Sequence, residues 1–198
     1  MDHHPSIVGL GGTTRTNSTS ERALRSCLAA AAQFGARTEI FTAAALDLPY
    51  YGAAGCCDHP KALRLIAALR NADAVILSSP AYHGGVSGLL KNALDYIEEL
   101  RFDPRPYLDM CAVGCIVCAN GPQAIGTSLT SMRSIVHALR GWPTPLGVGI
   151  NTSVVSVDEA GICSAPEINV QIRTLARQIV DFVKMSAASG EQALCAAE

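Results

Sequence analysis

Apolar and polar positions along the chain follow two patterns with different periods. Short apolar runs are typical of strands buried on both faces. Longer segments with an apolar residue every third or fourth position are typical of amphipathic helices. The pattern predicts strands over Ser6–Leu10, Thr38–Phe41, Ala74–Ser78, Met110–Val117 and Leu146–Ile150, the last continuing into a strand-like Ser153–Val157, and helices over Thr19–Phe34, Pro60–Arg70, Gly88–Leu100, Ile125–Leu139 and Glu167–Met185.

The alternation of strands and helices predicts an α/β fold with a five-stranded parallel sheet. Right-handed crossovers between parallel strands place helices on both faces of such a sheet. We expect a single domain over residues 1–185 and a flexible tail over residues 186–198. Ligands of open parallel sheets bind beyond the carboxyl ends of the strands. The loops after the first, third and fourth strands are therefore the candidate site.

The composition narrows the class of partner. The chain is 49% hydrophobic and 16% charged, with a formal net charge of −2. This balance argues against a nucleic-acid or membrane-surface partner. The richest apolar run, Cys27–Ala32, is too short to cross a membrane, and Met1–Pro5 has no basic or long apolar stretch. We expect no secretion signal and a cytoplasmic location.

The cysteines do not form an evident metal or redox motif. Of the eight cysteines, Cys115 and Cys118 have C-x-x-C spacing, but they lie in a predicted strand, where residues three apart point to opposite faces. That placement favours core packing. Cys56-Cys57-Asp58-His59 lies in a loop, and no second ligand pair with zinc spacing accompanies it. No metal site is predicted.

The loop between the first strand and first helix is rich in small hydrogen-bonding side chains. Every residue from Thr13 to Ser20 except Arg15 carries a hydroxyl or an amide. The G-x-G-x-x-G pattern fails at Thr14, and no lysine for a P-loop precedes Lys61. Two hypotheses remain: a phosphate cradle at a helix N-terminus, or a solvated loop with a good helix cap. Ser18 and Glu21 have the spacing of a capping box.

The segment after the third strand carries a more specific motif. It reads S-S-P-A-Y-H-G-G-V-S-G-L-L-K-N-A-L-D from Ser78 to Asp95. It resembles the pattern P-x-Y-x-x-x-x-x-G-x-L-K-N-x-L-D of the NAD(P)H-dependent FMN reductase family, which has a flavodoxin-like fold. The matching positions are Pro80, Tyr82, Gly88, Leu90, Lys91, Asn92, Leu94 and Asp95. The order of elements from about Ser6 to Lys184 is similar as well, with one departure: Asn120 stands where related proteins tend to have a glycine.

The resemblance implies a flavodoxin-like three-layer sandwich and a set of cofactor contacts. The first loop would hold the FMN phosphate, the second would surround the isoalloxazine edge, and the third would support the pyrimidine side. The residues so implied are Thr13, Arg15, Asn17, Ser18, Thr19 and Ser20; Pro80, Ala81, Tyr82, His83, Gly84 and Gly85; and Asn120 and Gly121. Leu89, Leu90, Leu94, Ile97 and Leu100 form an apolar stripe that is either core or core plus dimer seam.

The resemblance also implies hydride transfer from NADPH or NADH to FMN and on to an acceptor. The acceptor would be free flavin for a partner monooxygenase, a quinone, an azo compound or a metal ion. No catalytic side chain is predicted, because the cofactor carries this chemistry. The assembly would be a homodimer or homotetramer. Arg15, Arg105 and Arg140 are candidates for an NADPH phosphate. The alternative is a flavodoxin-like electron carrier that binds FMN without nicotinamide turnover.

Overall fold

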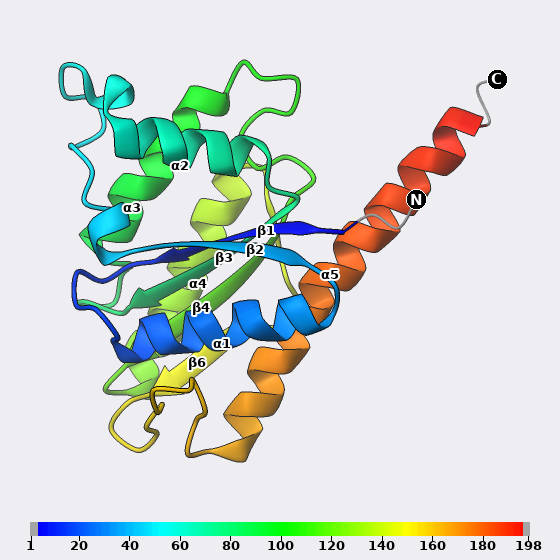
Figure 1. Cartoon of the computed structure of the whole chain (residues 1–198). Coiled ribbons are helices and arrows are strands. Elements are labelled where there is room, and N and C mark those ends of the chain that lie inside the picture. The colour runs from blue at the N-terminus through cyan, green and yellow to red at the C-terminus, as the bar shows by residue number, and fades with distance from the viewer. Residues whose placement is uncertain (1–3, 196–198) are drawn as a thin grey trace.

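A computed structural model describes residues 4–195 and shows a three-layer α/β sandwich (Figure 1). The strands are β1 Ser6–Gly11, β2 Arg37–Thr42, β3 Ala74–Pro80, β4 Ala112–Ala119, β5 Trp142–Pro143 and β6 Val148–Asn151. The helices are α1 Thr19–Gln33, α2 Pro60–Arg70, α3 Gly88–Asp95, α4 Pro122–Ala138 and α5 Pro166–Cys195, with 3₁₀ turns η1 Ala43–Ala45, η2 Cys56–Asp58 and η3 Tyr96–Leu100.

All strand pairs are parallel, in the order β2-β1-β3-β4-β5, with β6 also paired to β4. This is the flavodoxin-like order. β5 pairs with β4 at Ala112 and Val113, and β6 pairs with β4 from Ile116 to Ala119. Because β3 occupies the other edge of β4, β5 and β6 share the fifth position of the sheet. The expected five-stranded sheet is confirmed, with its last strand interrupted.

Helices cover both faces of the sheet, as predicted. α1 and α5 bury one face, and α2, α3 and α4 bury the other. Alternation along the strands supplies both cores: Val75 and Leu77 of β3 enter one cluster, and Ala74 and Ile76 enter the other. Helices packed on both faces therefore fix the positions of the strands, including their carboxyl ends.

Several predicted bounds are wrong: β4 runs over Ala112–Ala119, α4 begins at Pro122, and three further departures are larger. α3 ends at Asp95 and continues as the 3₁₀ turn η3 to Leu100. Within residues 4–195 no strand follows β6, because the Asn151 carboxamide accepts hydrogen bonds from the backbone N–H and hydroxyl of Ser153 and turns the chain. α5 runs past Met185 to Cys195, and this last part projects from the body (Figure 1).

The apolar stripe predicted along α3 and η3 belongs to the core. Leu90, Leu94, Ile97 and Leu100 are at most 2% exposed in the single chain. Leu89 is half-buried and packs against the same cluster. Four of the five side chains are therefore buried within the single chain, and Leu89 keeps a partly exposed surface.

Candidate cofactor site

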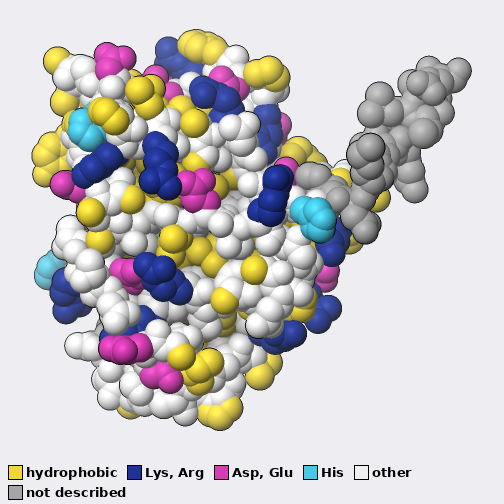
Figure 2. Space-filling view, viewed as in Figure 1, with side chains coloured by type: hydrophobic (Ala, Val, Ile, Leu, Met, Phe, Trp, Pro, Cys, Tyr) yellow, Lys and Arg dark blue, Asp and Glu magenta, His cyan; other side chains and the backbone are white. Residues whose placement is uncertain are grey.

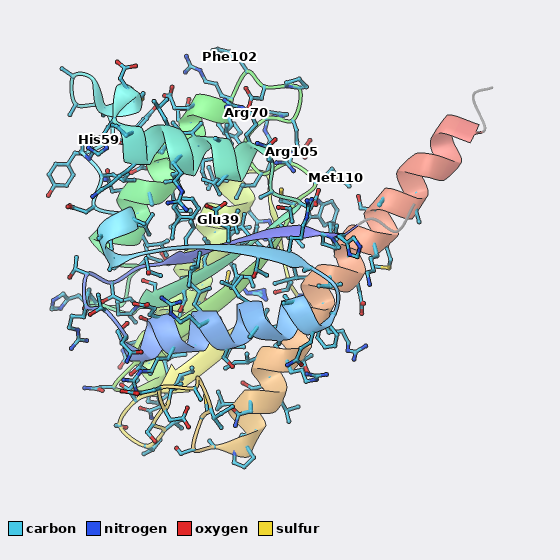
Figure 3. The ribbon with its side chains drawn as sticks, in the orientation of Figure 1. Glu39, His59, Arg70, Phe102, Arg105 and Met110 are labelled. Atoms are coloured by element: carbon cyan, nitrogen blue, oxygen red, sulfur yellow. The ribbon has the colours of Figure 1, made fainter. Side chains whose placement is uncertain are left out.

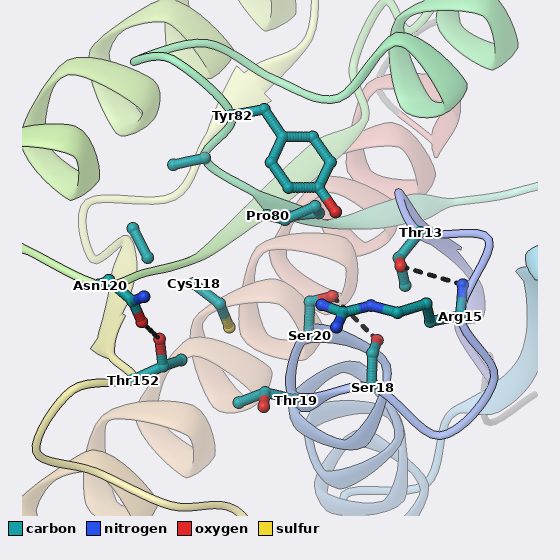
Figure 4. A pocket seen from close by; sticks show the side chains of 12 residues that line it. Thr13, Arg15, Ser18, Thr19, Ser20, Pro80, Tyr82, Cys118, Asn120 and Thr152 are labelled. Atoms are coloured by element: carbon teal, nitrogen blue, oxygen red, sulfur yellow. Dashed lines mark hydrogen bonds between the residues drawn. The ribbon is translucent and has the colours of Figure 1, made fainter.

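A cavity of about 290 Å³ lies at the carboxyl ends of β1, β3, β4 and β6 (Figure 4). Its walls come from four segments distant in sequence. It is lined by Thr13, Arg15, Ser18, Thr19, Ser20, Pro80, Ala81, Tyr82, Cys118, Ala119, Asn120 and Thr152. Of the described residues that line it, none is acidic. The three predicted loops therefore meet at one place, as the rule for parallel sheets requires.

The first loop leads from β1 into the N-terminus of α1. Ser18 is the N-cap: its backbone is extended, and its hydroxyl accepts a hydrogen bond from the Glu21 N–H at 3.3 Å. The first N–H groups of the helix have no acceptor within it. Thr19 and Ser20 carry such groups, and both residues line the cavity. Free donors and the positive end of the helix dipole therefore face it.

Hydroxyls and one guanidinium complete the cradle of the first loop. Thr13 and Ser20 are 4% and 3% exposed and line the cavity. The Ser20 and Ser18 hydroxyl oxygens are 3.2 Å apart. The Arg15 side chain extends over this end of α1 (Figure 4), and among the described residues it has no carboxylate partner. The cradle offers hydroxyl, N–H and guanidinium donors together.

Asn17 is the predicted phosphate contact that the structure does not bring to the cavity. Its backbone is left-handed, with φ of 57°. Its N–H donates to Glu21 Oε2 at 3.0 Å. A capping box would bring the Glu21 carboxylate to the Ser18 N–H, so this part of the predicted motif is not formed. Arg22 Nε donates to Asn17 Oδ1 at 3.1 Å, and Arg22 Nη1 donates to the Val157 carbonyl at 2.8 Å. Asn17 shapes the loop from outside the cavity.

The second loop forms a tight turn over residues 82–85. The Gly85 N–H donates to the Tyr82 carbonyl at 3.1 Å, and the two residues form an antiparallel bridge. The residues between them, His83 and Gly84, have φ of 52° and 80°, the combination of a type I′ turn. Tyr82 is 53% exposed at the mouth of the cavity.

A second cavity of about 620 Å³ adjoins the first, because Ala81, Ala119 and Asn120 line both. His83, Gly84 and Gly121 line only the second cavity, and Gly85 lines neither. The Thr152 hydroxyl donates to Asn120 Oδ1 at 2.6 Å, which fixes the orientation of that amide (Figure 4). Asn120 stands where related proteins tend to have a glycine, and it lines both cavities.

Sequence reasoning missed part of the lining. The residues concerned are Cys118, Ala119 and Thr152 in the first cavity, and Gln123, Ala124 and Thr127 in the second. Cys118 and Ala119 end β4, and Thr152 directly follows β6, so the strand-end rule applied to every strand identifies them. The second group lies on α4, behind the predicted third loop.

The C-x-x-C cysteines pack as predicted, on opposite faces of β4. Cys115 enters one core cluster and Cys118 enters the other. Burial raises the pKa of each thiol to about 12, so both stay protonated at neutral pH. His59 has a structural role: its Nδ1 accepts from the Lys61 N–H and caps α2. In the described part of the chain, no group of three or more His, Cys, Asp or Glu side chains is arranged to hold a metal.

A flavodoxin-like sheet with a donor-rich cavity at its carboxyl edge defines a class of nucleotide-binding α/β proteins. The model of the NADPH-dependent FMN reductase family matches residues 5–154, and the chain belongs to this family.

Known proteins similar to this chain include an FMN-dependent NADPH-azoreductase of Staphylococcus aureus. The two are 34% identical over 117 residues, which is 58% of this chain and 58% of the azoreductase. The match therefore spans little more than half of that relative.

Solved structures share the fold. The flavoenzyme NAD(P)H:acceptor oxidoreductase FerB of Paracoccus denitrificans superposes with a TM-score of 0.70 at 20% identity, over 91% of this chain and 98% of that one. An apo NADH:FMN oxidoreductase superposes with a TM-score of 0.64 at 21% identity, over 88% of this chain and 90% of that one.

Proposed function

We propose that the protein is an NAD(P)H-dependent FMN reductase that binds FMN in the cavity at the carboxyl edge of its sheet. One observation carries the proposal: the first turn of α1, Arg15 and the turn after β3 line a single cavity. A donor-rich end beside a flatter, less polar wall is the combination that a phosphorylated flavin needs. Family membership supports the same cofactor.

The phosphate end of the cavity fits a dianion. Thr13 and Ser20 present nearly buried hydroxyls, and the first turn of α1 presents N–H donors. Arg15 adds a guanidinium that no carboxylate of the described chain neutralises. Because no acidic residue lines this cavity, no side chain there opposes a phosphate electrostatically.

The ring end of the cavity fits a flat heterocycle. Pro80, Ala81 and Ala119 give a wall of small apolar surface, and the Asn120 amide supplies a donor and an acceptor. The left-handed backbone at His83 and Gly84 folds the turn back, which keeps its tip beside this wall. Pro80, Ala81, Ala119 and Asn120 would hold the ring at this wall.

When bound, FMN supplies the hydride-accepting chemistry of the reaction. The residues of the chain would bind and orient it: the cradle would hold the phosphate and the wall would hold the ring, while Tyr82 lies at the cavity mouth. We assign no catalytic acid or base to the chain.

The proposal extends to the reductant, the acceptor and the assembly. The reductant is NADPH, or NADH, and the acceptor is free flavin, a quinone, an azo compound or a metal ion. Of the three arginines predicted for the NADPH phosphate, only Arg15 lines the cavity. Arg105 binds the carbonyls of Leu69, Arg70 and Ala72, and Arg140 lies over the Tyr107 ring. The hypothesis also places the protein in the cytoplasm as a homodimer or homotetramer. A flavin-dependent monooxygenase would receive the reduced flavin.

The face seen in Figure 2 gives no sign of a polyanionic partner. Figure 2 shows basic and acidic side chains interspersed over one face, with no continuous basic stripe. No helix in the part of the chain described here has the length and apolar character needed to cross a bilayer.

Purified protein tests the proposal directly. We expect it to bind FMN, seen by quenching of flavin fluorescence, and to oxidise NADPH or NADH when FMN and an acceptor are present. An electron carrier of the alternative class would bind FMN without nicotinamide oxidation. Absence of both binding and turnover would refute the reductase hypothesis.

The Arg15→Ala variant tests the phosphate end. Loss of a charge-assisted hydrogen bond costs about 1.5–3 kcal/mol, so we expect FMN affinity to fall roughly 10- to 100-fold. Arg37→Ala is the matched control, because Arg37 is also an exposed arginine but lies at the start of β2, outside the cavity. Equal FMN affinity in Arg15→Ala and Arg37→Ala would place the phosphate elsewhere.

A further inference from the structure

Two adjacent cysteines lie in the segment that joins β2 to α2, outside the cofactor cavity. Cys56 and Cys57 form the start of η2, and their Sγ atoms are 3.5 Å apart with both thiols free. We propose that this pair, the Cys56–Cys57 dithiol, is a binding site for trivalent thiophilic metalloid compounds, of which aryl arsenicals are the type. The site is independent of FMN.

The geometry selects this class of ligand. The two sulfur atoms lie side by side, so a single atom can bond both from the same direction. Zinc needs four ligands, and no third His, Cys, Asp or Glu of the described chain joins the pair in a metal-binding group. His59, labelled in Figure 3 at the start of α2, uses Nδ1 to cap that helix. A trivalent arsenical needs only two sulfurs, because its third substituent is its own aryl group.

The loop that carries the dithiol is held in place by the helical segment beside it. Asn92 accepts from the Tyr51 N–H at 2.9 Å and donates to the Pro49 carbonyl at 3.0 Å. The buried Tyr96 hydroxyl lies 2.9 Å from the Pro49 carbonyl and 3.4 Å from the Cys56 carbonyl. The sulfur atoms therefore start close to the bound arrangement, which lowers the entropic cost of chelation.

The dithiol is open to solvent on one side. Cys56 is 5% exposed, Cys57 is half-buried, and the turn formed by residues 52–55 is exposed. A reagent therefore meets Cys57 first. Partial burial and hydrogen bonds to Cys56 and Glu99 raise the pKa of the Cys57 thiol to about 12. Cys57 thus keeps its proton at neutral pH, and formation of an arsenic–sulfur bond releases that proton.

The binding step needs no oxidant or reductant. An aryl arsenic(III) oxide loses its arsenic–oxygen bonds and forms one arsenic–sulfur bond to each cysteine. The two thiol protons leave with the oxygen as water, and arsenic stays trivalent. Closing the second bond is intramolecular, so the chelate exceeds a single-thiol adduct in affinity by roughly 100-fold or more.

The test uses the full chain, kept reduced with a phosphine, and phenylarsine oxide as the probe. We expect native mass spectrometry to show one phenylarsenic group per chain. A dithiol such as 2,3-dimercaptopropanol should remove it, and excess glutathione should not. Tryptic digestion should place the group on the peptide Thr38–Lys61, whose only cysteines are Cys56 and Cys57.

Single variants decide between this pair and the other thiols. Cys57→Ser should reduce retention of the probe roughly 100-fold, and Cys56→Ser should do the same. Cys163→Ser is the matched control, because Cys163 is buried like Cys56, and it should retain one equivalent. Full retention in Cys57→Ser, removal by glutathione, or an adduct on a peptide other than Thr38–Lys61 would overturn the proposal; the peptide assignment needs no variant to fold.

Discussion

At the scale of single residues, the first loop shows how neighbouring hydrogen bonds set a backbone path. The Glu21 side chain is 5% exposed and accepts from Arg25 as well as from the Asn17 N–H. A buried carboxylate needs such partners to offset its lost hydration. The left-handed turn at Asn17 follows from that bond, and it directs the chain from the cavity wall into α1.

Gly12 is a second residue whose environment constrains the site. A Cβ on Gly12 would lie 2.6 Å from the Ser87 hydroxyl and 3.0 Å from Leu90 Cβ. We expect Gly12→Ala to cost about 1–3 kcal/mol through overpacking, measured as a lower urea midpoint. Gly88→Ala is the control, because a Cβ on Gly88 meets no atom within 4 Å, and its midpoint should be unchanged or higher. Equal midpoints for both variants would contradict the crowding.

Most residues of the first loop that line the cavity were predictable, because hydroxyls before a helix have a local physical purpose. Thr13, Arg15, Ser18, Thr19 and Ser20 all line the cavity. The exclusion of Asn17 was not predictable, because it depends on which N–H the Glu21 carboxylate reaches. The contribution of Thr152 depends on contacts between strands far apart in sequence, which a local pattern does not contain.

At the scale of elements, the periodicity of apolar residues located each long helix and each central strand. It failed where a strand is very short or where a side chain takes hydrogen bonds that a strand partner would otherwise make. β5 has only two residues, Trp142 and Pro143, too few for any periodic signal. The segment after β6 alternates in polarity like a strand. The Asn151 side chain, however, accepts from the Ser153 N–H and hydroxyl, and the Asn151 carbonyl accepts from the Val154 and Val155 N–H groups. Strand propensity is context-dependent for this reason.

The N-terminus of α3 gives a test at this scale. The Ser87 hydroxyl accepts from the Leu90 N–H at 3.2 Å, and the Ser87 N–H donates to the Ser79 hydroxyl at 3.0 Å. We expect Ser87→Ala to destabilise the fold by about 1 kcal/mol, because one helix N–H loses its acceptor. Ser134→Ala, at an exposed position within α4, should be neutral or slightly stabilising. Chemical denaturation measures both, and no difference between them would rule out the cap.

At the scale of the whole molecule, the cavity is made by the meeting of strand ends and helix starts. The two apolar clusters hold the sheet from both faces, and the loops at its carboxyl edge are free to carry polar groups. This separation explains why the polar residues that line the cavity lie in loops and at the start of α1, while the strands read only as apolar runs.

Ligand-linked stability tests the site in the intact protein. FMN at about 100 times its dissociation constant should stabilise the fold by about 2.7 kcal/mol, which raises Tm by roughly 5–10 °C in a chain of this size. Riboflavin lacks the phosphate, so at the same concentration it should give a much smaller shift. Equal shifts from both flavins would show that the cradle does not carry the affinity.

Arg22 joins two segments that lie far apart in sequence. Its guanidinium donates to the Asn17 side chain before α1 and to the Val157 carbonyl after β6. The first loop and the segment after β6 therefore depend on one shared cation, and the loss of Arg22 would remove a contact from both at once.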